Sequence, residues 1–453
     1  MKEDIFMYYY EDIFIESNFD RISLNSISLL NEIADQSIAS GVKANRNMLL
    51  DALCNLNVGL LRAVSKGAGS RAYRSMASGS FTGELIGYRP FSNAVDGLKN
   101  LDLIEVEEGF APVPGYETGP AKASRFKATD KLHALWKSHG IKPVEWNHHF
   151  EGRPRPASID EPIILKSEKK TKKHPITGLP KTTPAKRMEF DPTIPFVQQA
   201  AREVNEINAF FSKQDITPAH SLYAFRRIFS LGDHPTFNWD KGGRLYAIGG
   251  YQQMKKEERA NITINGEQVV EIDVRASHLT ILHSLKGVPL PAHDPYAGSG
   301  YPRFVTKSWV AMTLGHNTRP GYQWSGTAKE TYAKKKCGVR KLPTVGLGLC
   351  KVTCGGKCLQ TFFPMSKVGP KIAAHFPILD DWETSPWRWG DFQYRESQAI
   401  IGAVHELATV HAIPALPVHD SLIVPKSHQA KAEQVLSCMF EKHVGVRPVL
   451  TVK

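Results

Sequence analysis

Two aspartates stand beside runs of apolar residues, where a carboxylate is costly unless a positive charge compensates it. Asp273 lies in VVEIDVRASH, residues 269–278, whose β-branched residues are typical of a buried strand. Asp420 lies between Leu416–Val418 and Leu422–Val424, two apolar runs that predict a tight hairpin with Asp420 at its apex. Two carboxylates on neighbouring strand ends form a site for two divalent cations, as used in phosphoryl transfer. An ordinary turn aspartate is the alternative for Asp420 alone.

The chain between these aspartates supplies cations. Arg303 and Lys307 are four residues apart, so they share one face of a helix predicted over 301–317. Such a pair is suited to holding a triphosphate, and a lysine can protonate the departing pyrophosphate. Upstream, DKGGR at 240–244 places two glycines, which permit a close backbone turn, before Arg244 and a strand. A simple glycine turn is the alternative for that segment.

Positive charge is concentrated in the same part of the chain. The 453 residues carry 57 Lys and Arg against 45 Asp and Glu, a net charge of +12. Residues 301–371 alone hold thirteen basic residues and one acid, with aromatic residues between them. That composition suits a partner with phosphates to neutralise and bases to stack on, and a solvated basic surface is the alternative. Residues 151–190, with ten basic residues and six prolines, are expected to be a linker that buries no core.

Composition limits the class of protein. A hydrophobic fraction of 42% and an aromatic fraction of 9% support globular cores and exclude wholesale disorder. Apolar runs fall short of the roughly 18 residues of a membrane span, and the acidic start does not have the pattern of a signal peptide, so we expect a cytoplasmic protein without a membrane partner. Four cysteines spaced C-x12-C-x3-C-x3-C offer ligands for a structural zinc ion, although a paired CxxC is missing: Cys337, Cys350, Cys354 and Cys358.

Residues 1–150 show a separate order of elements. Two predicted helices, the second at about 90–100, precede two short strands, Leu103–Val106 and Ser124–Ala128. This order resembles a winged helix-turn-helix, which implies a module that binds nucleic acid or another protein. The resemblance implies that the second helix enters a groove and that two wing residues lie near phosphates: Arg125 and Lys127.

Downstream, four motifs occur in the order found in the single-subunit polymerase superfamily, which joins family A DNA polymerases with bacteriophage-type RNA polymerases. DKGGR resembles its DxxGR motif, EIDVRASH its motif A, RFVTKSWVAMTL its motif B and VHDS its motif C. The resemblance implies an α+β fold, a right-hand core with an antiparallel palm sheet and helical fingers, preceded by the mainly α winged-helix-like domain. The core would span 191–453, with the palm at 235–286 and 396–453 and the fingers at 287–395.

The resemblance also implies roles for individual residues around a pair of metal ions. Asp273, the Val274 backbone carbonyl and Asp420 match the ligands of two Mg²⁺ ions, which Mn²⁺ can replace. His419 matches a residue near the primer end.

The remaining matched residues would bind the substrates. Arg303 and Lys307 match the pair that holds the incoming nucleoside triphosphate, and Asp240 and Arg244 match the contacts with template and hybrid.

Two departures from the family pattern leave sugar preference open. His278 stands where the DNA-synthesising branch carries a glutamate and the RNA branch a small residue, so it is expected near the nucleotide. Gly315, His316 and Asn317 occupy the place of the tyrosine expected after motif B, and His316 is the nucleotide-binding candidate among them.

We therefore expect a compact nucleotidyltransferase that adds nucleoside monophosphates to a 3′-hydroxyl on a DNA or RNA template, with Mg²⁺ and nucleoside triphosphates. The trimmed architecture implied by the family suits a primase or polymerase of phage or mobile-element replication. Two alternatives stay open: a non-catalytic DNA-binding replication or regulatory protein with an idle palm, and a template-independent terminal transferase.

Overall fold

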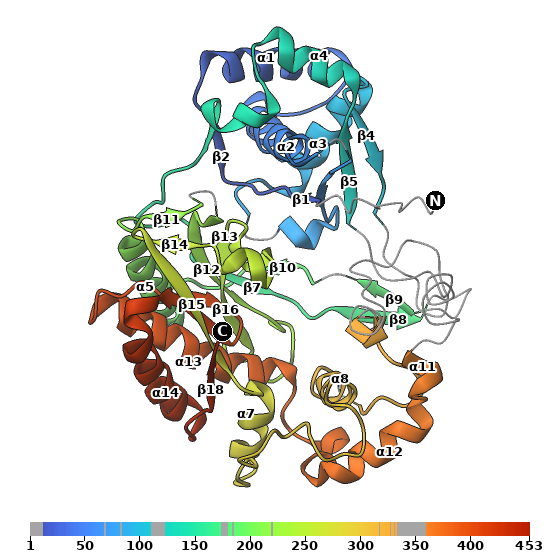
Figure 1. Ribbon diagram of the computed structural model, residues 1–453, viewed down its shortest axis with the longest axis vertical. Helices are drawn as coiled ribbons and strands as arrows, with labels where there is room; N and C mark the ends of the chain where they lie inside the picture. The colour runs from blue at the N-terminus through green and yellow to red at the C-terminus, as the bar shows by residue number, and fades with distance from the viewer. Residues whose placement is uncertain are drawn as a thin grey trace, which may run out of the picture.

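The computed structural model describes residues 12–453 apart from 68, 82–83, 110–122, 174–179, 184, 219–220, 317, 327, 330 and 333–358. The chain is a mixed α+β protein whose buried apolar residues form two separate cores. One core draws on residues between Ile15 and Phe150, the upper part of Figure 1, and the other on residues between Ile163 and Val444, the lower part. The four cysteines considered as zinc ligands lie outside the described residues: Cys337, Cys350, Cys354 and Cys358.

Helix α2 (Arg46–Lys66) forms the centre of the N-terminal core, where it packs against α1 and α3. It begins where the Asn45 side chain accepts hydrogen bonds from two backbone N–H groups, an N-cap. By length and composition it is the one helix in the described residues that passes for a membrane span, and 72% of its most apolar window is buried inside the domain. Packing against the rest of the domain therefore accounts for its apolar residues.

A small sheet with strand order β1-β3-β5-β4 covers this helix. The two strands predicted from the sequence are confirmed as β4 (Ile104–Glu107) and β5 (Ser124–Ala128), which pair antiparallel. Helix α3 (Tyr88–Asn100) directly precedes β4. The other elements of this part are β1 (Ile13–Phe14), β2 (Phe19–Arg21), α1 (Leu24–Ala39), β3 (Ala72–Arg74), α4 (Asp130–Ser138) and β6 (Phe150–Gly152).

The segment expected to be a linker contributes to the second core. Strand β7 (Ile163–Lys166) pairs parallel with β12 (Ala224–Phe229) and antiparallel with β10 (Arg187–Met188). The first three residues of β7 are buried, so the expectation that 151–190 buries no core is wrong. Beyond β7 the chain forms a hairpin of β8 (Lys170–Lys173) and β9 (Pro180–Thr183). The resulting sheet has the order β10-β7-β12-β13, with β13 at Gly242–Ile248.

A second sheet carries both aspartates. Its order is β11-β14-β15-β17-β16, with β18 also paired to β15, and all of its pairs are antiparallel. The predicted strand around Asp273 and the predicted hairpin around Asp420 are both confirmed. The strands are β11 (Ile216–Thr217), β14 (Thr263–Ile264), β15 (Glu267–Val274), β16 (Leu416–Val418), β17 (Ser421–Pro425) and β18 (Leu450–Val452).

Helix α13 (Trp389–Thr409) is the central helix of the second core, because it packs against α5, α7, α14 and β13. In Figure 1 it crosses the sheets beside α14, while α8 and α12 lie apart from the sheets at the lower right. The remaining helices of this part are α5 (Pro195–Phe211), α6 (Lys256–Arg259), α7 (Ser277–Leu285), α8 (Arg303–Leu314), α11 (Leu359–Phe362), α12 (Met365–His375) and α14 (Gln429–Val444).

Candidate active site

Asp273 and Asp420 meet at one end of the β15–β17 ladder. Asp273 pairs in register with Ser421, and the Val274 N–H donates to the Asp420 carbonyl oxygen over 3.0 Å. Tight turns follow Asp273 and precede Asp420: Ala276 has φ 54° where β15 gives way to α7, and His419 has φ 55° in the β16–β17 turn. Non-glycine residues in this left-handed region are uncommon and gather at functional sites.

The two carboxylates have different electrostatic surroundings. The Asp273 carboxylate lies 2.9 Å from the Lys453 ammonium. The Asp420 carboxylate has no ion pair within the described part of the chain. Burial, together with the neighbouring carboxylates of Glu396 and Asp273, raises the pKa of Asp420 to about 6. The site therefore gathers negative charge around Asp420 that nearby cations leave incompletely compensated.

This donor set fits Mg²⁺. Mg²⁺ is bound in proteins through one or two carboxylates, with water and substrate phosphates completing its shell. Asp273, Asp420 and the Val274 carbonyl offer such oxygen ligands. Among the described residues no group of three or more His, Cys, Asp or Glu side chains is placed to hold a metal ion. Any further ligands of the Mg²⁺ ions would therefore be water molecules or substrate phosphates rather than His, Cys, Asp or Glu side chains of the described residues.

Glu396 on α13 belongs to this site, although the sequence did not single it out. Its Oε1 accepts a hydrogen bond from the Arg244 Nε over 3.0 Å, and its Oε2 accepts one from the Ser277 hydroxyl over 2.8 Å. The His278 Nε2 lies 3.3 Å from Oε2. Burial by itself would raise the pKa of Glu396, but the charges of His278 and Arg244 outweigh it and hold that pKa well below its usual range. Glu396 thus stays an anion inside the protein.

A weak sequence signal for Glu396 exists. It lies four residues from Phe392 and four from Ile400, and both are buried on the same face of α13. A charged residue within an apolar helical stripe is buried at a cost unless it is paired, so its position predicts a partner.

Arg303 and Lys307 lie on one face of α8, as the spacing predicted. The Arg303 Cζ is 5.3 Å and the Lys307 Nζ 6.0 Å from the centre of the same Tyr296 ring. The Arg303 guanidinium also forms an ion pair with Asp294. Burial, together with the charges of Asp294 and Asp420, raises the pKa of Tyr296 to about 12, against the opposing effect of Arg303. The charge of Asp420 thus acts on Tyr296, the ring against which both cations of α8 lie.

The DKGGR segment is held rigidly beside α13. Gly242 and Gly243 both have φ 73°, and a Cβ on either would lie 3.0 Å from a neighbouring atom. The Lys241 ammonium bridges Asp240 at 3.1 Å and Asp391 at 2.7 Å. These contacts fix the start of β13, from which the Arg244 side chain reaches Glu396.

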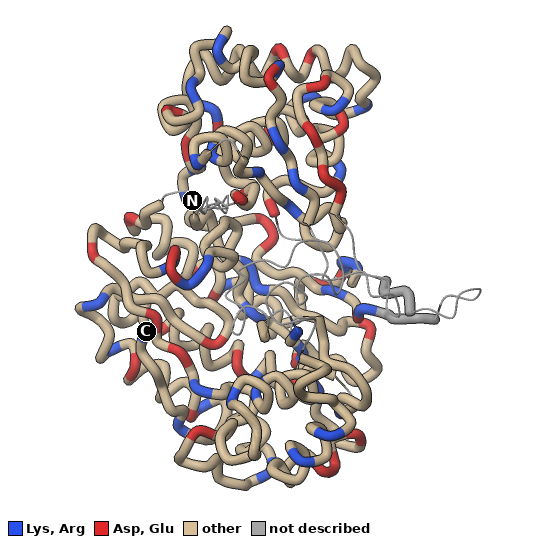
Figure 2. Tube along the Cα trace, turned by 45° about the vertical axis from the view of Figure 1, so that its right-hand side comes forward, with Lys and Arg blue, Asp and Glu red and all other residues tan. Residues whose placement is uncertain are grey.

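Three further predicted site residues lie outside the contacts described so far. His316 is exposed beyond the end of α8, and its carbonyl oxygen accepts a hydrogen bond from the Trp382 indole over 2.8 Å. The Trp382 ring stacks on Phe392, which in turn lies beside the His278 ring. Arg125 pairs with Asp12 at 2.8 Å and Glu107 at 3.6 Å, while Lys127 pairs with Glu105 at 3.5 Å. Figure 2 shows basic and acidic residues interspersed over this N-terminal part. Arg125 and Lys127 are thus already partnered by acids.

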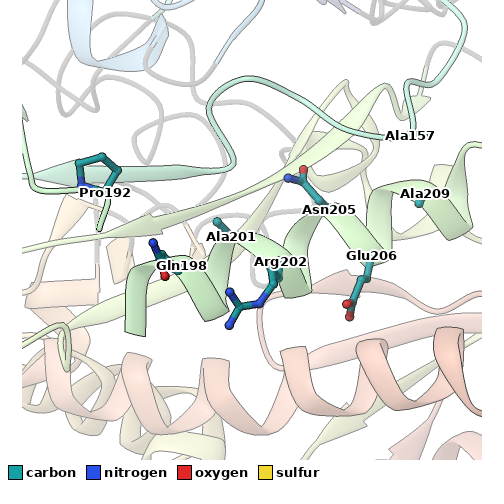
Figure 3. A pocket seen from close by; sticks show the side chains of 8 residues that line it. All are labelled: Ala157, Pro192, Gln198, Ala201, Arg202, Asn205, Glu206 and Ala209. Carbon is teal, nitrogen blue, oxygen red and sulfur yellow. The ribbon is translucent and has the colours of Figure 1, made fainter. Parts of the chain in front are cut away.

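A hollow elsewhere on the surface is separate from this chemistry. A shallow groove of about 680 Å³ runs along α5 and is lined by Gln198, Arg202 and Glu206 among others (Figure 3). None of the site residues described above lines it.

Comparison with known proteins adds little to this geometry. No protein-family model matches the chain, and a search of curated proteins finds no match. Among solved structures it is similar to the POL domain of Pol1 from M. smegmatis in complex with DNA primer-template and dNTP, at 10% sequence identity and a TM-score of 0.27. The match covers 97% of this chain and 66% of that one, so the chain spans just under two thirds of the length of that structure. A likeness this distant carries no argument about function.

Proposed function

We propose that this protein is a nucleotidyltransferase that extends the 3′-hydroxyl of a nucleic-acid strand with nucleoside monophosphates. The observation that supports it most is the strand register, in which Asp273 pairs with the residue that follows Asp420. Two aspartates 147 positions apart in the chain thereby share one end of a sheet. A purely structural sheet gains nothing from two adjacent carboxylates, because each must be desolvated and repels the other.

The proposed chemistry divides between the carboxylates and α8. Asp273, Asp420 and the Val274 carbonyl would hold two Mg²⁺ ions, which supply charge stabilisation for the attacking and leaving oxygens when bound. Lys307 and Arg303 would bind the triphosphate, for which Arg303 exchanges Asp294 for a phosphate. Lys307 is then the group that donates a proton to the departing pyrophosphate.

Residues on the other side of the carboxylates would hold the nucleic acid. Arg244 and Asp240 are proposed to contact template and hybrid, and His278 to lie beside the nucleotide. Burial, followed by the charge of Arg244, lowers the pKa of His419, so its imidazole is neutral at pH 7 and able to accept a hydrogen bond near the primer end.

The N-terminal domain is proposed as a winged-helix-like nucleic-acid-binding module. The strand order β3-β5-β4, with α3 directly before β4, supports this assignment. Arg125 and Lys127 would have to exchange carboxylate partners for phosphates. Helix α3, with Arg89 exposed in its first turn, is the better candidate for groove contact. A compact polymerase or primase of phage or mobile-element replication fits this combination.

In the test, the purified protein is incubated with Mg²⁺ and with either labelled NTPs or labelled dNTPs. Separate reactions contain a primer-template, a bare template or a single-stranded primer. The proposal predicts template-directed extension of the primer. One homopolymer whatever the template would mean a terminal transferase. Nucleic-acid binding with no incorporation under any condition would mean a non-catalytic binding protein.

A further inference from the structure

Arg244 has two carboxylates within its electrostatic reach. Burial alone would lower the pKa of this guanidinium, but Glu396 and, more weakly, Asp420 raise it above its ordinary value. Both acids thus act on one cation. The hydrogen bonds of Arg244 nonetheless go to Glu396, through Nε over 3.0 Å and through Nη2. Within the described residues, Arg244 therefore pairs with Glu396 and not with Asp420.

We propose that Glu396 is a positioning residue that keeps Arg244 off Asp420, so that the Asp420 carboxylate stays available to a divalent cation. The inference rests on the cation site of the proposed function. It assigns different roles to three buried or half-buried carboxylates. Asp273 and Asp420 bind the cation, and Glu396 binds Arg244.

The way Glu396 is held supports this role. Its residue is only 1% exposed. The Ser277 hydroxyl donates to the second carboxylate oxygen, and Ser277 and His278 begin α7 directly after the strand of Asp273. Helix α13 also packs against β13, which carries Arg244. Hydrogen bonds from Arg244 and Ser277 therefore hold one carboxylate oxygen of Glu396 each.

The energetic argument follows from the cost of a buried charge. Arg244 is largely buried, and a buried guanidinium left without an anion is strongly destabilising, because its desolvated charge is then uncompensated. If Glu396 loses its charge, Arg244 loses its hydrogen-bonded anion, and Asp420 is the other carboxylate whose charge acts on it. A pair between Arg244 and Asp420 would compete directly with a bound cation.

The test measures the affinity of the full chain for Mn²⁺ by electron paramagnetic resonance, without nucleotide or nucleic acid. Four proteins form a double-mutant cycle: wild type, Glu396→Gln, Arg244→Gln and the double variant. We expect Glu396→Gln to weaken Mn²⁺ binding by about tenfold or more in the wild-type background, as for other residues that orient metal ligands. In the Arg244→Gln background the same change should cost less than about threefold, because no arginine remains to compete.

Two further variants separate positioning from charge. Glu396→Asp keeps the negative charge but withdraws it from Arg244, so it should also weaken Mn²⁺ binding, and it serves if Glu396→Gln fails to fold. Glu406→Gln is the matched control, since Glu406 lies on the same helix 3.7 Å from a histidine, His411, but outside the site. It should leave the affinity unchanged.

Equal costs of Glu396→Gln in both backgrounds would overturn the proposal, because Glu396 would then act only as a distant negative charge. Unchanged affinity in Glu396→Gln, or a wild type that does not bind Mn²⁺, would overturn it as well. A protein that binds Mn²⁺ with the expected coupling but incorporates no nucleotide would contradict the proposed function and would still support this inference.

Discussion

At the scale of single residues, several charged groups near the carboxylates already have partners within the protein. Asp273 has Lys453, Arg244 has Glu396, and Arg303 has Asp294. Lys307 lies over an aromatic ring rather than beside an acid, and it has no ion pair within the described residues. An ammonium over a ring face remains available to a phosphate. Lys307 is therefore the cation of the site that is best placed to bind a triphosphate without first giving up a partner.

Replacing Lys307 with methionine tests that role. The change keeps the stem but removes the charge, so the KM for the nucleoside triphosphate should rise by roughly 10- to 100-fold, the worth of one charge-assisted hydrogen bond. The affinity for primer-template should stay unchanged, as read by fluorescence anisotropy. Lys367→Met, on the exposed first turn of α12, is the control. A KM equal to that of the control would contradict the assignment.

Local patterns were sufficient to predict some of these residues and not others. Asp420 was found because two apolar runs flank a short polar turn, and a hairpin is a local structure. Glu396 was missed because an acid within a helix is ordinary until the partner helix and strand are known. Its partner Arg244 is 152 positions away in the chain, and no spacing rule connects them. Lys453 was missed for the same reason.

At the scale of elements, the start of β13 is set by two glycines. Gly243 has φ 73°, and a Cβ there would lie 3.0 Å from the Phe229 ring. Gly266 also has a positive φ, of 80°, but nothing lies within 4 Å of its Cβ position. Substitutions at Gly243 and Gly266 therefore separate two contributions to the free energy of unfolding: the cost of a left-handed backbone and the cost of a steric clash.

Alanine at these two positions should therefore have different effects. Gly266→Ala should lower the free energy of unfolding by about 1 kcal/mol, the cost of a left-handed alanine. Gly243→Ala should cost about 1–3 kcal/mol more from overpacking, and it should weaken primer-template binding because it displaces Arg244. Urea unfolding and anisotropy measure the two effects. Equal destabilisation by both variants would show that the close approach at Gly243 is unimportant.

Elements with a strong internal period were predicted well, and those that depend on distant partners were not. Helix α8, at Arg303–Leu314, lies within the range 301–317 predicted from the sequence. Strand β7 was read as linker because Ile163, Ile164 and Leu165 are three apolar residues in a polar, proline-rich stretch. Its burial comes from pairing with β12, about sixty residues later, which the local composition does not reveal.

At the scale of the whole molecule, the N-terminal domain meets the core at a buried acid. The Glu16 carboxylate forms an ion pair with Arg62 at 2.6 Å. It also lies against Gly250 of the core, where a Cβ would be 2.5 Å from its Oε1. Burial raises the pKa of Glu16 to about 7, although Arg62 and Arg74 oppose the shift. The contact between the two parts therefore holds a proton more tightly than the unfolded chain does.

Stability should consequently depend on pH through Glu16. The unfolded chain releases this proton near the ordinary glutamate pKa and the folded protein releases it near 7, so the free energy of unfolding falls as pH rises between those values. The shift corresponds to ~3 kcal/mol at most. Urea midpoints at pH 5 and pH 7.5 should differ less in Glu16→Gln than in wild type. An identical difference in both proteins would remove Glu16 as the cause.

The most direct measurement of the central claim is the rate of pyrophosphate release on a primer-template with Mg²⁺ and the matching nucleoside triphosphates. Asp273→Asn and Asp420→Asn should each lower the rate by about a thousandfold or more, with primer-template affinity unchanged. Asp380→Asn, a 68% exposed carboxylate outside the site, should leave the rate within about twofold. Near-normal rates in either site variant would contradict the account, because the two carboxylates would then not share the reaction.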